Sequence, residues 1–140
     1  MNRCVKLLKQ GYAMKIKDYE SIPYRHIKDI YMDNIDIKDL ALLLNEDPRR
    51  ISRMINLNAR PTTDFVTKYL DLFGLNMVLL KDDKLYSEDL KISHLIKSKH
   101  LLAKQIGVSN SYFYNSTDNY RIDIFIKTLD YFGLELAIMQ

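Results

Sequence analysis

Residues 36–80 read DIKDLALLLNEDPRRISRMINLNARPTTDFVTKYLDLFGLNMVLL, and residues 98–139 read SKHLLAKQIGVSNSYFYNSTDNYRIDIFIKTLDYFGLELAIM. The pair Leu40-Ala41 recurs 62 positions later as Leu102-Ala103, and six residues within Lys68–Leu75 recur 59 positions later. The second copy is therefore shorter by three residues (62 − 59 = 3), between helical segments, where loops absorb changes of length. This internal repeat predicts two structural units of the same kind in one chain.

Length and composition set limits on the fold. The chain has 140 residues, 47% of them hydrophobic, with 4 Gly and 3 Pro. This composition indicates folded structure, and the length fits two small units packed on each other. No stretch approaches the roughly 20 apolar residues of a membrane span, and the N-terminal residues do not resemble a signal peptide. A lone cysteine, Cys4, excludes an internal disulfide and suits the reducing cytoplasm, where we expect the protein to reside.

The net charge of +3 is small, so local clusters are more informative than the total. No acidic residue interrupts either of two basic clusters, which are Arg3, Lys6, Lys9, Lys15 and Lys17, and Arg49, Arg50, Arg53 and Arg60. Local clusters can hold phosphates even where the net charge is low. For the N-terminal cluster, a solvated basic face is an equally good interpretation.

Apolar residues at helical spacing, preceded by capping residues, predict that most of the chain is helical. In the first unit we expect a helix from Ser21 and three more that begin at Asp36, at Asp47, and at Thr62 or Thr63. The corresponding starts in the second unit are Ser87, Ser98 and Ser109.

Each repeat closes with a short alternating segment that is rich in branched residues. LNMVLL follows Gly74 and LELAIM follows Gly133, and glycine commonly ends a helix. We predict a short strand in each segment, at 75–80 in the first unit, and pairing of the two strands in an antiparallel ribbon across a pseudo-two-fold axis. The alternative is that each segment is a frayed extension of its helix.

A characteristic string of residues lies inside the first repeat. The string consists of Leu40-Ala41, a turn at Asn45–Asp47, ISRMIN at 51–56 and Arg60-Pro61-Thr62. It resembles the lambda-repressor-like (Cro/Xre-type) helix-turn-helix family, and LLAKQIGVS at 101–109 matches the first part of the family pattern even better. Leu57 stands where the family usually has glycine, so we expect that loop to take another path.

The resemblance implies an all-α fold. It consists of two tandem helix-turn-helix units. Each unit ends in the short β-strand that its alternating segment predicts, and pairing of the two strands in a ribbon would make the chain a pseudo-dimer. The corresponding boundaries are a basic N-terminal extension at 1–20, the first unit at 21–80, a linker at 81–86 and the second unit at 87–140.

By this resemblance, the helix at residues 48–56 enters the major groove of DNA, which is wide enough to accept a helix. Arg49 and Arg53 lie about one helical turn apart, and arginine can bind guanine through two hydrogen bonds. The expected DNA-binding residues of the first unit are Arg49, Arg50, Ser52, Arg53, Asn56 and Arg60.

The matching helix of the second unit, expected at residues 110–117, contains no Lys or Arg. Two interpretations stay open. Asn115 takes the place of Arg53 and can bind adenine, whereas Tyr112 and Tyr114 suggest contact with a protein. The DNA contacts expected for this unit are Ser111, Tyr114, Asn115, and, as phosphate partners, Lys104 and Arg121.

The sequence therefore predicts sequence-specific binding of double-stranded DNA, by a transcriptional repressor of phage or mobile-element type. The alternative is a protein-binding module on the same scaffold, either an antitoxin or an inhibitor of a bacterial defence nuclease such as an anti-CRISPR. We expect no enzyme, metal or cofactor, because the three histidines are scattered and no Gly-rich phosphate loop exists. Association of two chains as a homodimer stays open.

Overall fold

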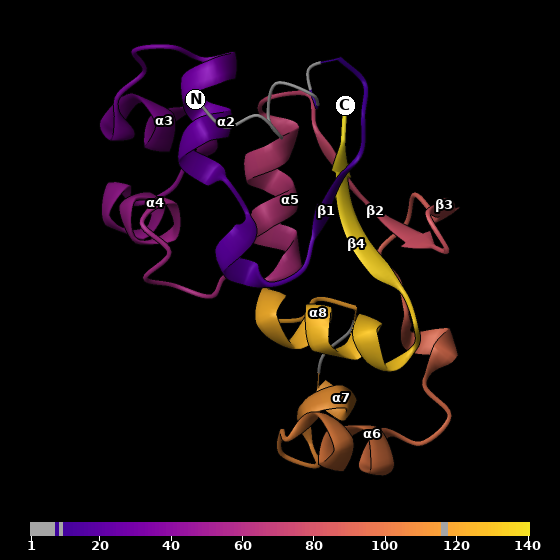
Figure 1. Cartoon of the computed structure of the whole chain (residues 1–140). Coiled ribbons are helices and arrows are strands. Elements are labelled where there is room, and N and C mark those ends of the chain that lie inside the picture. The colour runs from indigo at the N-terminus through magenta and orange to yellow at the C-terminus, as the bar shows by residue number, and fades with distance from the viewer. Residues whose placement is uncertain (1–7, 9, 116–117) are drawn as a thin grey trace.

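The computed structural model describes residues 8, 10–115 and 118–140, and Figure 1 shows how their elements are arranged. Helices α3 and α4 lie at one end of the molecule, α6 and α7 lie at the other, and the sheet lies beside α5 (Figure 1). In chain order the elements are β1 (Met14–Ile16), the 3-10 helix η1 (Tyr19–Ser21), α2 (Tyr24–Tyr31), α3 (Ile37–Leu44), α4 (Pro48–Ile55), α5 (Thr63–Asp71), β2 (Asn76–Lys81), β3 (Lys84–Ser87), the 3-10 helix η2 (Ser93–Leu95), α6 (Lys99–Ile106), α7 (Tyr112–Asn115), α8 (Ile122–Tyr131) and β4 (Glu135–Met139).

The prediction of an all-α fold is wrong. The described residues are 48% helical and 15% strand, and they include a four-stranded antiparallel sheet, so the fold is mixed α/β. The strand order is β1-β4-β2-β3. The sequence interpretation found only the two inner strands. An isolated two-stranded ribbon is marginally stable in water, and the outer strands β1 and β3 supply the additional pairing that such a ribbon needs.

The ribbon of the two repeat-closing strands is confirmed, and its register shows the internal symmetry. Val78 of β2 pairs with Ala137 of β4, and these residues are 59 positions apart (137 − 78 = 59), which is the offset of the repeat. Thr62 and Arg121 face each other in an isolated bridge at the same separation (121 − 62 = 59). Because equivalent residues pair at both places, a pseudo-two-fold axis passes through the ribbon and through the bridge.

Residues 81–86, predicted as a linker, form a tight turn and most of β3. Asp82 and Asp83 have φ values of 51° and 65°, and positive φ at both central residues is the signature of a type I′ hairpin turn. The usual signal for this turn is Asn-Gly or Asp-Gly, and Asp-Asp lacks the glycine. Aspartate nevertheless tolerates this conformation better than most residues.

Part of the predicted N-terminal extension also belongs to the sheet. Met14 and Ile16 are buried and pair with β4, while Lys15, between them, points to solvent and forms ion pairs with Asp83 and Glu135. The partners of this three-residue strand lie more than 100 positions away, so local sequence carries little sign of it.

Four predicted helix caps are confirmed. In each case the side-chain oxygen accepts a hydrogen bond from a backbone N–H in the first turn. The four capping residues are Asp36 for α3, Asp47 for α4, Thr62 for α5 and Ser98 for α6. Helices α3 and α6 begin and end at positions 62 residues apart, so the repeat offset sets both boundaries.

Three predicted helix starts are wrong. The helix expected from Ser109 begins only at Tyr112, as α7. Ser21 ends η1, where its hydroxyl donates to the carbonyl oxygen of Asp18 at 2.8 Å, and α2 begins three residues later. Ser87 ends β3, and its hydroxyl accepts from the backbone N–H of Asp89 at 3.0 Å. Such local side-chain hydrogen bonds compete with helix formation, and η2 is the only helical turn between residues 88 and 98.

The loop after α4 contains a left-handed residue without glycine. Leu57 has a φ of 60°, the backbone region that favours glycine, and its side chain packs partly buried against the core. Leu57 therefore adopts a backbone conformation that glycine favours, and the expectation that this loop takes another path than in the family stays a prediction.

Candidate nucleic-acid interface

Helix α4 has a buried apolar face and an exposed basic face. Ile51, Met54 and Ile55 are buried, which leaves Arg49 and Arg53 exposed on the opposite face. Helix α3 joins α4 through a short turn in which Asn45 adopts the left-handed conformation, with a φ of 54°. The buried face packs toward the core, so Arg49 and Arg53 point outward.

Arg49 is widely exposed, with 90% of its side chain accessible. Its Nη2 lies 3.1 Å from Oδ2 of Asp47, while Oδ1 of Asp47 accepts the backbone N–H of Arg49 at 2.8 Å. The hydrogen bond from the Arg49 side chain is the main reason that the pKa of Asp47 lies below its ordinary value. The carboxylate both caps α4 and holds one of the two candidate base-reading side chains.

Arg50 is engaged within the protein. Its Nη1 lies 3.1 Å from Oε2 of Glu46, and its guanidinium carbon lies 4.0 Å from the ring centroid of Phe65 in α5. Glu46 also pairs with Lys68 of α5 at 3.2 Å. Arg50 therefore braces α4 against α5, a role that the sequence analysis did not assign to it.

The side chain of Arg53 has no hydrogen bond or ion pair with any residue of the described ranges, and it is exposed. Its neighbour Ser52 is half-buried and accepts a hydrogen bond from the Asn56 amide at 3.4 Å. Asn56 in turn accepts a hydrogen bond from Arg25 of α2. Arg25 thus joins this surface from another helix, and sequence analysis missed it because its contact spans 31 residues.

Two adjoining hollows mark the surface beside α4. One, of about 390 Å³, is lined by Asp47, Arg49, Arg50, Arg53 and Ala59. The next, of about 280 Å³, continues from Arg50 and Arg53 to Arg60 and to the N-terminus of α5. The predicted basic cluster therefore folds into one concave surface.

Arg60 and Arg121 meet at one carboxylate beside the pseudo-two-fold axis. Nη1 of Arg60 lies 3.3 Å from Oδ2 of Asp123, and Nε of Arg121 lies 2.6 Å from Oδ1 of the same residue. Burial raises the pKa of Asp123, but hydrogen bonds and charge from Arg121 and Arg60 outweigh burial, so the net shift is downward. Both guanidiniums remain about half exposed and carry one positive charge in excess of the carboxylate.

Replacing Asp123 with asparagine is expected to lower the free energy of unfolding at pH 7 by on the order of 1 kcal/mol, since both arginines are half exposed. The lowered pKa means that the carboxylate stabilises the fold above its unfolded pKa of about 4, and that this contribution is lost as pH falls through the folded pKa. Urea denaturation at pH 7 and pH 3 checks this. The difference between wild type and Asp123→Asn should shrink at pH 3, and a constant difference would contradict the assignment.

Helix α7 occupies the position of α4 in the second unit and spans a single turn within the described residues. The predicted reading helix extended to 117, and residues 116–117 lie outside those described. Side chains that the sequence assigned to DNA in this unit are exposed: Ser111, Tyr114, Asn115, Lys104 and Arg121. Tyr114 is 63% exposed, with Nζ of Lys99 4.8 Å from its ring centroid.

Tyr112 packs inward. Its ring stacks on Tyr120 with 6.2 Å between centroids, and its hydroxyl oxygen accepts the backbone N–H of Arg121 at 2.9 Å. The two aromatic candidates for a protein contact therefore differ, because Tyr112 supports the loop before α8 whereas Tyr114 faces solvent.

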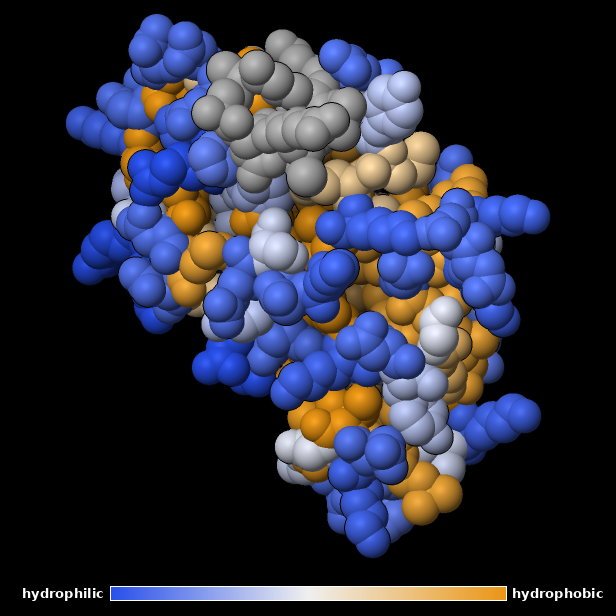
Figure 2. All heavy atoms as spheres, viewed as in Figure 1, coloured by the Kyte–Doolittle hydropathy of each residue, from blue (hydrophilic) through white to orange (hydrophobic). Residues whose placement is uncertain are grey.

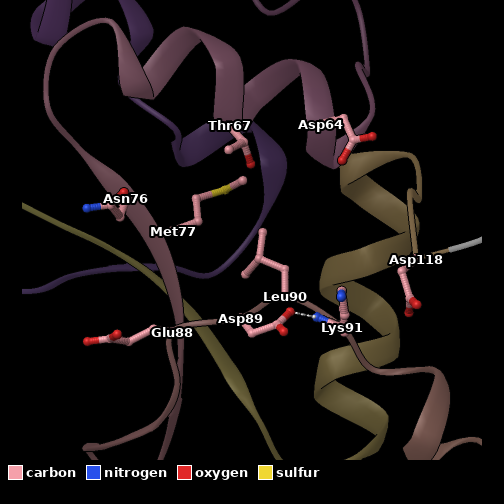
Figure 3. Close-up of a pocket in the computed structure, with 9 residues that line it drawn as sticks. All are labelled: Asp64, Thr67, Asn76, Met77, Glu88, Asp89, Leu90, Lys91 and Asp118. Atoms are coloured by element: carbon pink, nitrogen blue, oxygen red, sulfur yellow. Dashed lines mark hydrogen bonds between the residues drawn. The ribbon is translucent and has the colours of Figure 1, made fainter.

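Figure 3 shows a different hollow, of about 410 Å³, between α5, β2 and the segment after β3. Four of its lining residues are acidic (Asp64, Glu88, Asp89 and Asp118), and one, Lys91, is basic. Such a surface repels phosphate, so the basic surface beside α4 is the better candidate for nucleic acid.

The remaining predictions concern the N-terminal cluster, metals and membranes. Arg3, Lys6 and Lys9 lie outside the described residues. Among the residues that the structure describes, no three His, Cys, Asp or Glu side chains gather as a metal site, and no helix has the length and apolar character to cross a membrane. No protein-family model, curated protein or solved structure matches the chain.

Proposed function

We propose that this protein binds double-stranded DNA sequence-specifically, with α4 in the major groove, and that it acts as a transcriptional repressor of phage or mobile-element type. The observation that carries the proposal is the outer face of α4, where Arg49 and Arg53 are exposed opposite a buried apolar face. Arginine at such positions can form paired hydrogen bonds with guanine O6 and N7. We further propose that the protein resides in the cytoplasm.

Two further features support the proposal. Arg60 and Arg121 retain a net positive charge beside the pseudo-two-fold axis, where a duplex that spans both units would pass. Arg50 and Asn56 contact residues outside α4, so the helix itself needs little ordering on binding.

Salt dependence of binding tests the proposal. We expect the affinity for a mixed pool of short DNA duplexes to fall steeply with NaCl, because each phosphate that a cation neutralises releases counterions. Fluorescence anisotropy measures this, with an RNA duplex of the same length as competitor. A-form RNA has a major groove too narrow for a helix, so equal competition by RNA would contradict the proposal.

Replacing Asp47 with asparagine is expected to tighten binding to the DNA pool by a few-fold. Asparagine caps helices as well as aspartate does, so α4 should persist, while Arg49 loses its ion pair and the carboxylate no longer repels phosphate. The control is Asp64→Asn, which removes an acid from the first turn of α5 in the acidic hollow. Weaker binding by Asp47→Asn than by this control would contradict the assignment of Arg49.

The alternative, a protein-binding module, is favoured by one observation. The exposed face of α7 carries Tyr114, 63% accessible, and no Lys or Arg. If the main partner is a protein, such as a toxin or a defence nuclease, Tyr114→Ala should abolish function while Arg53→Ala leaves it intact. If α4 reads DNA, Arg53→Ala should abolish function and Tyr114→Ala should leave it intact.

A further inference from the structure

Helix α3 exposes two large apolar side chains that the DNA-binding proposal does not use. Leu42 is 73% exposed and Leu43 is 58% exposed. They extend along the helix from Lys38 and Asp39, which are also exposed, and the capping residue Asp36 is acidic. Figure 2 shows hydrophobic surface among hydrophilic side chains at this end of the molecule. We call this the α3 surface.

A complementary groove lies on the second unit, between η2, α6 and the end of α8. It has a volume of about 310 Å³, and its lining includes Leu101, Tyr131, Phe132 and a single charged residue, Lys97. Leu101 is 62% exposed and Tyr131 is 54% exposed. The walls are thus apolar, and the lining contains no carboxylate.

The internal repeat explains why this groove exists. In the first unit α2 covers the equivalent position, where the rings of Tyr31 and Phe73 lie 6.2 Å apart and Phe73 is buried. The second unit has only the three-residue η2 in place of that helix, so Phe132, 59 residues after Phe73, is less completely covered. The groove lies where α2 covers the first unit.

Charge distinguishes the two surfaces. Residues 29–39 include four aspartates and one lysine, whereas residues 91–117 contain four lysines and no acidic residue. The two copies of the repeat therefore differ in charge. The first unit is acidic around α3, and the second unit is basic around the groove. Opposite potentials on two apolar surfaces favour their association and disfavour contact of either surface with itself.

We propose that the α3 surface of one copy docks in the groove of a second copy, so that chains associate head to tail. The two surfaces lie at opposite ends of the molecule (Figure 1), so a pair of chains retains one free α3 surface and one free groove. A contact of one helix in one groove is small, so the association is weak and weakens further with salt. The proposal does not depend on DNA binding.

Sedimentation velocity over a range of protein concentrations tests the proposal. Wild type should show a weight-average mass that rises with concentration, beyond a dimer at the highest values. Leu42→Arg breaks the α3 surface and Leu101→Asp breaks the groove, and each should weaken association at least about tenfold, since each removes a buried leucine contact. Leu85→Arg, which changes a leucine 52% exposed on β3, is the matched control and should associate like wild type.

A mixture of Leu42→Arg with Leu101→Asp gives the decisive result. Each variant keeps the surface that the other lacks, so the mixture should form a one-to-one dimer that grows no further. A mixture that stays monomeric while wild type associates would overturn the proposal. A single variant that associates as well as wild type would also overturn it and would indicate contact between identical surfaces. Wild type that stays monomeric at all concentrations would also overturn it and would leave the groove to another protein. Circular dichroism checks that each variant folds. A second pair of variants, Leu43→Arg on the α3 surface and Tyr131→Asp in the groove, repeats the same test.

Discussion

Replacing Leu136 with proline is expected to lower the free energy of unfolding by at least about 3 kcal/mol. Leu136 lies in β4, one of the two inner strands of the sheet, where it pairs with Leu79 of β2 and Ile16 of β1. Proline has no backbone N–H, so it removes a hydrogen bond between β4 and one of its neighbouring strands. It also removes the buried leucine side chain. Urea denaturation followed by circular dichroism measures the loss.

Leu136→Val is the control for this prediction, because valine keeps the N–H and an apolar side chain that favours strands. If Leu136→Pro unfolds at the same urea concentration as Leu136→Val, the ribbon that joins the two units is wrong. The same result would remove the basis of the pseudo-two-fold axis, since Val78 and Ala137 define it within this ribbon.

Replacing Arg49 and Arg53 together with alanine is expected to weaken binding to the preferred duplex by roughly 30-fold to 10⁴-fold, because each paired contact with guanine is worth about 1–3 kcal/mol. The folded state should change little, since both side chains point outward from α4. Anisotropy with the preferred duplex and with a scrambled duplex measures both affinity and discrimination.

The matched control replaces Lys81 and Lys84 with alanine, which removes the same charge from exposed positions of the β2–β3 hairpin. This control should lose little affinity for the preferred duplex and no discrimination. Equal losses in the two double variants would contradict base reading by α4 and would indicate that only total charge matters.

The repeat and its capping residues allowed much of the helical architecture to be predicted. Asp36, Asp47 and Ser98 act through the backbone N–H groups that follow them directly, so their effect is local and readable from sequence. The ribbon was also predictable, because equivalent strands of two repeats can pair across an axis of symmetry.

The outer strands and the missing helix of the second unit were not predictable in the same way. The strand β1 has only three residues and gains its pairing from β4, which lies at the other end of the chain. The segment after Ser87 has helical spacing of apolar residues, yet the chain turns instead. The Ser87 hydroxyl and the Asp89 carboxylate accept hydrogen bonds from the backbone N–H groups of Asp89 and Lys91. In both cases tertiary contacts or local side-chain bonds override the periodic pattern.

The candidate site likewise contains features that the sequence predicts and features that it does not. Exposure of Arg49 and Arg53 follows from helical spacing, whereas the roles of Arg50 and Arg60 depend on partners that sequence spacing does not reveal. Phe65 and Asp123 lie 15 and 63 residues from their arginines (65 − 50 = 15; 123 − 60 = 63) and come from other helices. Arg25 was missed for the same reason.

Selection of bound duplexes from a random DNA library tests the central claim most directly. Reading by α4 predicts an enriched motif with guanines in one half, and unlike halves, because α4 presents arginines where α7 presents none. The Arg49→Ala/Arg53→Ala variant should lose those guanines. No enrichment by wild type, or the same motif enriched by the variant, would contradict the claim that α4 reads DNA.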